Sequence, residues 1–165
     1  AVPLISPAIA ILGWVVVAKQ TEKREQKKRE SDVAREKKNK CENASGNLIA
    51  KISENINLIE ELSYEYFTLD LNDGFSGKLE TKLMGIFRIT LRQFKKLNDI
   101  HKTGGFEEVN FSFQEKVIAL KVQVTKAPFQ TNDRVKLTSS DEKLKDISKK
   151  CNDLIIQLQE IEILN

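Results

Sequence analysis

The feature that most constrains this chain is its first 18 residues, AVPLISPAIAILGWVVVA, which carry no charge and end abruptly at Lys19. Eighteen helical residues rise about 27 Å, slightly less than the roughly 30 Å hydrocarbon core of a bilayer. Pro7 shortens the helix, because proline favours the first helical position and Ser6 before it is a good N-cap. The run therefore predicts a membrane anchor over residues 1–18 that is only just long enough to span.

Three other interpretations of this run stay open: a buried core helix, an interfacial segment and a cleaved signal peptide. Val16 and Ala18 resemble the small residues of a cleavage site, but no basic region precedes the run. A core helix is also rarely followed by such dense charge. Mostly small residues recur along one face of the expected helix, at i, i+4, i+7 and i+11, and such a stripe allows membrane helices to pack closely. They are Ser6, Ala10, Gly13 and Val17.

The segment after the apolar run is strongly basic. Residues 19–40 contain ten Lys and Arg against five Asp and Glu, whereas residues 41–165 contain 17 basic and 19 acidic residues. Lys and Arg beside a membrane segment stay on the cytoplasmic side, so we expect a single-pass membrane protein with a cytoplasmic body.

Residues 19–42 contain neither Gly nor Pro and have no apolar stripe, which predicts a solvated helical connector or stalk, with a disordered linker as the alternative. Basic residues at this distance from a bilayer favour anionic lipid headgroups as partners. Nucleic acid is not favoured, because no aromatic residues interleave with the charges. The expected headgroup contacts are Lys19, Lys23, Arg24, Lys27, Lys28 and Arg29.

The remaining residues, 43–165, carry apolar side chains every three or four positions, which is helical spacing. They predict an antiparallel bundle of about four helices, so the expected fold is all-α: a membrane helix, a charged stalk and a bundle. The four expected faces are Ile49, Ile52, Ile56, Ile59, Ser63 and Tyr66; Leu79, Leu83, Ile86, Phe87, Leu91, Phe94 and Leu97; Phe106, Val109, Phe113, Val117, Leu120 and Val124; and Leu144, Ile147, Cys151, Leu154, Leu158 and Ile161.

Local signals mark the ends of these helices. Ser139 with Glu142 has the spacing of a capping box, and Ser112 with Glu115 offers a later start for the third helix. Residues 127–138, which contain Pro128, are expected to form the longest loop.

Candidate chemical groups are few. Cys41 and Cys151 are expected to be reduced thiols, with Cys151 in the core, and no Cys/His spacing predicts a metal. His101 is expected near a helix C-terminus, where a cation is favourable. We expect no cofactor and no enzyme activity. Three other pairs of charged residues could be candidates: the acid pairs Glu60 with Glu61 and Asp70 with Asp73, and the possible anion clamp Arg88 with Arg92. We expect each of these pairs to lie on a solvated surface.

The order of an uncharged start containing GW, then KQTEKREQKKRE, then a helical body containing FRITLRQFKKLN resembles small uncharacterised bacterial single-pass membrane proteins. The resemblance covers residues 9 to about 100 and is one of layout. It implies a tethered protein whose bundle binds copies of itself or another protein. Some proteins of this layout act beside antiviral or toxin modules, which implies the alternative of a membrane-disrupting effector that oligomerises its anchors.

Overall fold

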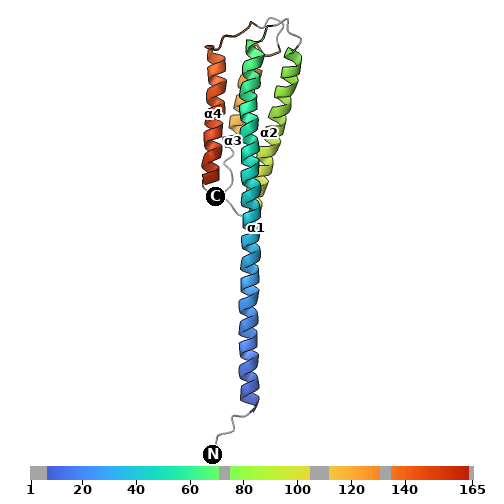
Figure 1. The fold of residues 1–165 in the computed structure, drawn as a ribbon, viewed down its shortest axis with the longest axis vertical. Helices are drawn as coiled ribbons and strands as arrows, with labels where there is room; N and C mark the ends of the chain where they lie inside the picture. The colour runs from blue at the N-terminus through green and yellow to red at the C-terminus, as the bar shows by residue number, and fades with distance from the viewer. Residues whose placement is uncertain (1–6, 71–74, 105–111, 131–134, 164–165) are drawn as a thin grey trace, which may run out of the picture. The chain divides into compact units, whose positions relative to one another are not determined.

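The computed structural model describes residues 7–70, 75–104, 112–130 and 135–163. Within these ranges the chain forms four α-helices and no strand, which confirms the expected all-α class (Figure 1). The helices are α1 (Pro7–Thr68), α2 (Ser76–Gly104), α3 (Ser112–Thr125) and α4 (Glu142–Ile163).

The chain divides into two compact units, residues 1–40 and residues 41–165, and the boundary lies inside α1. In the first unit every residue from position 10 to position 40 is exposed. Among the described residues, no helix has an apolar stretch long enough to cross a bilayer.

The second unit is an antiparallel four-helix bundle in which each helix runs opposite to the one before it (Figure 1). Its part of α1 lies between α2 and α4, while α3 packs closely against α2 and α4. The expected stripes supply the core: the five apolar residues of the first stripe and Ser63 are all buried, as are Leu144, Ile147, Cys151, Leu154 and Leu158. Burial of these stripes is the main term that holds the bundle together.

The stripes are less complete at their edges. Ile86, Leu91 and Ile161 are only partly buried and pack against the rim of the core. The third helix begins at Ser112, the later of the two expected starts, and the expected positions Phe106 and Val109 lie outside the described residues.

The expected cap of α4 is wrong. Ser139 is exposed, and α4 begins at Glu142, directly after Asp141. The Asp141 carboxylate accepts a hydrogen bond of 2.9 Å from the backbone N–H of Lys143, which is the contact an N-cap makes. The sequence rule placed the cap two residues too early, because Ser139 and Asp141 are both good capping residues and only the helix start distinguishes them.

The connection between α3 and α4 is tied to the bundle by Tyr66. Its hydroxyl donates to Glu80 Oε1 of α2 at 2.7 Å and accepts from the backbone N–H of Gln130 at 3.0 Å. Phe129, which is buried, packs against the Tyr66 ring with 5.0 Å between centroids. One side chain of α1 thus joins α2 and the α3–α4 connection.

The Lys143 side chain caps the C-terminal end of α3. Its ammonium group donates to the carbonyls of Gln123 (2.9 Å) and Lys126 (2.7 Å), and it lies 4.7 Å from the centre of the Phe67 ring. Partial burial, reinforced by the nearby charge of Lys126, lowers the pKa of Lys143. The contacts satisfy carbonyls that a helix end leaves unpaired.

Candidate functional site

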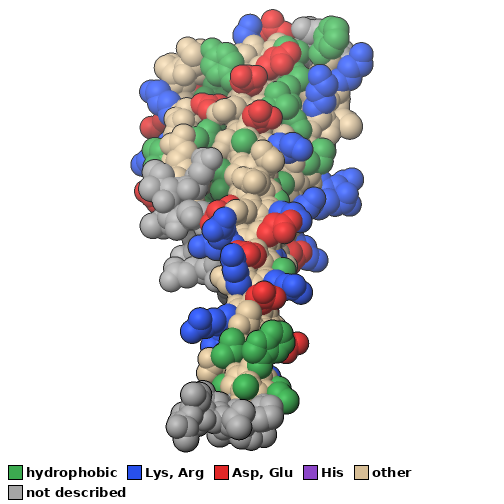
Figure 2. Space-filling view, turned by 60° about the horizontal axis from the view of Figure 1, so that its bottom comes forward, with side chains coloured by type: hydrophobic (Ala, Val, Ile, Leu, Met, Phe, Trp, Pro, Cys, Tyr) green, Lys and Arg blue, Asp and Glu red, His purple; other side chains and the backbone are tan. Residues whose placement is uncertain are grey.

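The apolar end of the first unit exposes large side chains on every side of the helix. Trp14 is 80 % exposed, Ile11 and Leu12 are each 64 % exposed, and Val15, Val16 and Val17 lie between 45 % and 61 %. Figure 2 shows these hydrophobic side chains gathered at the N-terminal end of the described helix. Covering one such side chain fully is worth about 1.5–3 kcal/mol, so this segment has a strong tendency to find an apolar environment.

The stripe of small residues is open where the structure describes it. A Cβ atom added at Gly13 meets nothing within 4 Å, and Ala10 and Val17 are exposed. Ser6, the first member of the stripe, lies outside the described residues.

The six expected headgroup contacts are all exposed on α1. At about 100° per residue they are distributed around the helix, so no single side is basic. Acidic residues lie between them, as Figure 2 shows. Further along, the Glu36 carboxylate and the Lys40 ammonium are 2.7 Å apart, and this hydrogen bond lowers the pKa of Glu36 and raises that of Lys40.

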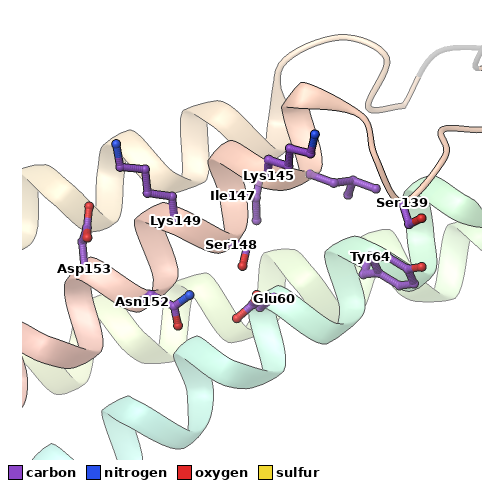
Figure 3. A pocket seen from close by; sticks show the side chains of 10 residues that line it. Glu60, Tyr64, Ser139, Lys145, Ile147, Ser148, Lys149, Asn152 and Asp153 are labelled. Carbon is purple, nitrogen blue, oxygen red and sulfur yellow. The ribbon is translucent and has the colours of Figure 1, made fainter.

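The bundle has a groove of about 520 Å³ between α1 and α4. Figure 3 shows Glu60 of α1 facing Ser148 and Asn152 of α4, whereas Lys145 and Lys149 point away from this cluster. Tyr64 and Ser139 line the other end of the groove. A carboxylate, a hydroxyl and an amide offer hydrogen bonds to a polar or cationic group.

Cys151 of α4 is not exposed at all. Burial, and secondarily the charge of Glu60, raise the pKa of its thiol to about 12. The thiolate is the nucleophilic form of cysteine, so Cys151 is a core residue and not a reactive group at neutral pH. Both cysteines are free thiols.

His101 lies in the last turn of α2, as expected, but it is buried there. It is 2 % exposed, and its Nε2 shares a hydrogen bond of 2.8 Å with the hydroxyl of Ser45, which is also 2 % exposed. A hydroxyl beside an imidazole can form a nucleophile and base pair, but neither group here is accessible to a substrate. The pair is a structural contact between α1 and α2.

The other expected chemical groups do not form a joint site. Glu60 lines the groove while Glu61 is exposed, and Arg88 and Arg92 are both exposed on α2. Asp70 pairs with Lys136 at 3.5 Å, and its expected partner Asp73 lies outside the described residues. Among the described residues, no group of three His, Cys, Asp or Glu side chains could hold a metal ion.

The Ser45 and His101 contact was missed, although the sequence contains a signal for it. Ser45 lies one helical turn before Ile49, the first residue of the first buried stripe. His101 lies one helical turn after Leu97, the last residue of the second stripe. Polar residues in phase with buried stripes on two helices are candidates for a hydrogen bond between them, because buried polar groups need partners.

Comparison with known proteins gives no relative: no family model, no curated protein and no solved structure matches the chain.

Proposed function

We propose that this protein is a membrane-tethered helical scaffold, with residues 1–18 inserted in the bilayer, residues 19–42 as a basic connector and the bundle acting at the cytoplasmic face. The observation that carries the proposal is the exposed apolar segment of α1. A helix that is apolar on all sides needs an apolar environment on all sides, and a lipid bilayer provides one.

The basic connector supports the same placement. The apolar segment is followed at once by Lys19, and Lys23 and Arg24 come one turn later, all of them exposed. Long basic side chains at this position extend to the headgroups and lengthen the span that a short apolar helix covers. They also favour the orientation with the bundle in the cytoplasm.

The bundle supports an interaction role, because the polar groups that it offers to a partner lie at its surface. The groove between α1 and α4 offers hydrogen-bonding side chains, and the buried hydroxyl and imidazole of Ser45 and His101 are used in packing. Binding of a protein through helix faces is the function that such a surface supports best.

The tether is tested by deleting residues 1–18 and separating membranes from cytosol in moderate salt. We expect the full chain to pellet with membranes and the truncated chain, whose core lies in the bundle, to stay in the supernatant. Pelleting of the truncated chain would place the membrane contact elsewhere. Dye uptake by cells that express the full chain would instead favour the membrane-disrupting effector.

Orientation is tested with an exposed thiol, introduced as Ser140→Cys in a chain with Cys41→Ser. Cys151 does not compete, because it is buried. A membrane-impermeant thiol reagent is expected to label the introduced thiol only after permeabilisation of the cells. Labelling in intact cells would place the bundle outside.

A further inference from the structure

Charge is segregated between α1 and α2 of the bundle. The chain has six acidic and no basic residues between Lys51 and Lys78, and five basic and no acidic residues between Glu80 and Asp99. Figure 2 shows Asp and Glu over the bundle part of α1 and Lys and Arg beside them over α2. The exposed acidic residues of this part of α1 are Glu54, Glu61 and Glu65. At about 100° per residue, the exposed basic residues of α2 that lie on the same side of the helix as Ile89 are Lys82, Arg92 and Lys96.

Two exposed apolar side chains lie between these charges. The Asn55 side chain donates a hydrogen bond of 2.8 Å to Gln93 Oε1, which aligns the antiparallel helices α1 and α2 at this level. Leu58 follows Asn55 by about one turn and Ile89 precedes Gln93 by about one turn, so they lie at the same level across the seam. Leu58 is 39 % and Ile89 is 50 % exposed.

We propose that a second copy of this chain binds here. The surface, called the α1/α2 face, consists of the six charged residues above with Leu58 and Ile89. The inference rests on the proposed scaffold function and names its partner. Charge complementarity favours a second copy as the partner, because the face has one acidic and one basic side with an apolar centre, and a second copy supplies the same three parts.

The charges also select the symmetry of the pair. A two-fold axis between the copies and parallel to the helices places α1 of one copy opposite α2 of the other, so acidic residues meet basic residues twice. A two-fold axis across the helices places α1 opposite α1 and α2 opposite α2, so like charges meet. The first arrangement is therefore favoured and the second is opposed.

The favoured arrangement suits tethered chains. Both copies of α1 run in the same direction, so the Cys41 ends of the two bundles lie at the same end of the pair. Two chains anchored in one membrane need this orientation. Opposed orientations, in contrast, would not allow both tethers to enter the same bilayer.

The available area predicts a contact of modest strength. Residues 44–68 of α1 and the α2 segment beside them form a surface about 37 Å long and about 20 Å wide, which is roughly 700 Å² per copy. Stable pairs cover about 800 Å² per partner, so this contact is near the lower limit. Confinement to a membrane raises the effective concentration of the second copy and favours pairing there.

Crosslinking of full-length chains in membranes tests the contact. One chain carries Leu58→Cys and a differently tagged chain carries Ile89→Cys, both with Cys41→Ser and Cys151→Ala. We expect a mixed disulfide after mild oxidation. The matched control replaces Ile89→Cys by Ile118→Cys, which is on α3 and has the same 50 % exposure. Equal yields from the two pairs would overturn the proposal.

Charge reversal gives a second and more demanding test in the same chains. One variant set is Glu54→Lys, Glu61→Lys and Glu65→Lys; the other is Lys82→Glu, Arg92→Glu and Lys96→Glu. Each set combined with itself places like charges opposite and is expected to reduce the disulfide yield about tenfold. Mixing the two sets restores both contacts, so the yield should return to the level of the unreversed pair.

The readouts separate the possible failures. All variants should retain the helicity of the parent chain, because the reversed side chains are exposed, and loss of helicity in both sets would show that these charges maintain the fold. Membrane pelleting without the specific disulfide overturns the pairing and leaves the tether. The specific disulfide without pelleting leaves the pairing and overturns the tether. Loss of binding to anionic vesicles by the chain with Lys82→Glu, Arg92→Glu and Lys96→Glu, without any effect on the disulfide, would assign the face to lipid.

Discussion

The hydroxyl of Ser45 and Nε2 of His101 lie 2.8 Å apart inside the bundle, although 56 positions separate the two residues in the chain. Each side chain is 2 % exposed. The contact joins α1 to the last turn of α2 and lies next to a small cavity of about 170 Å³ that Leu48 and Ile100 help to line.

Ser45→Ala should lower the free energy of unfolding by about 1–2 kcal/mol, because it removes one partner of a buried hydrogen bond. Urea unfolding followed by circular dichroism measures this change. Ser140→Ala is the matched control, since Ser140 is exposed, and we expect its effect to be within about 0.5 kcal/mol of zero. Equal effects of the two substitutions would show that the buried bond contributes nothing.

Tyr66→Phe should destabilise the bundle by about 1–3 kcal/mol, because the hydroxyl bonds to both Glu80 and the Gln130 amide are lost while the ring packing remains. Hydrogen exchange at the Gln130 amide should become faster in the variant. Tyr64→Phe, at a position that is 49 % exposed, is the control. An unchanged exchange rate at Gln130 would argue against the role of Tyr66 in holding the connection.

Asp141→Ala and Ser139→Ala distinguish the two possible caps of α4. Because Asp141 accepts the hydrogen bond from Lys143, its replacement should cost about 1 kcal/mol of stability. Ser139→Ala should have almost no effect. Thermal unfolding of the two variants side by side is sufficient, and the opposite order would restore the cap that the sequence suggested.

Cys151 should resist a thiol reagent at pH 8 in the folded protein, whereas Cys41, which is partly exposed, should react. Mass spectrometry after labelling identifies the modified residue. In denaturant both cysteines should react. Labelling of Cys151 in the folded state at a rate similar to Cys41 would contradict its burial.

The same thiol predicts a dependence of stability on pH. Its pKa is about 12 in the fold against an ordinary value of 9.0, so between these values the folded state holds a proton that the unfolded state loses. Stability should therefore fall as pH rises from about 9 towards 12. The decline should be smaller in Cys151→Ala, and equal slopes for the two chains would contradict the shifted pKa.

Helix class and core faces are determined locally, and for that reason the sequence predicted them. Ile52, Ile56 and Ile59 recur with the period of a helix, and all three have no exposed surface in the bundle. Leu154 and Leu158 also recur with the period of a helix, and both are almost fully buried. The uncharged first 18 residues and the basic segment after them are likewise properties of the sequence alone, and the proposed tether derives from them.

Contacts between distant residues depended on the tertiary structure, because their geometry is set by how the helices pack. The partner of Ser45, the two bonds of Tyr66 and the groove between Glu60 and Asn152 each need two helices in a particular register. The α1/α2 face shows both levels. The sequence shows that its acidic residues belong to α1 and its basic residues to α2. That Leu58 lies level with Ile89 is known only from the structure, where the hydrogen bond between Asn55 and Gln93 shows the register of the two helices. This register is a property of the folded core.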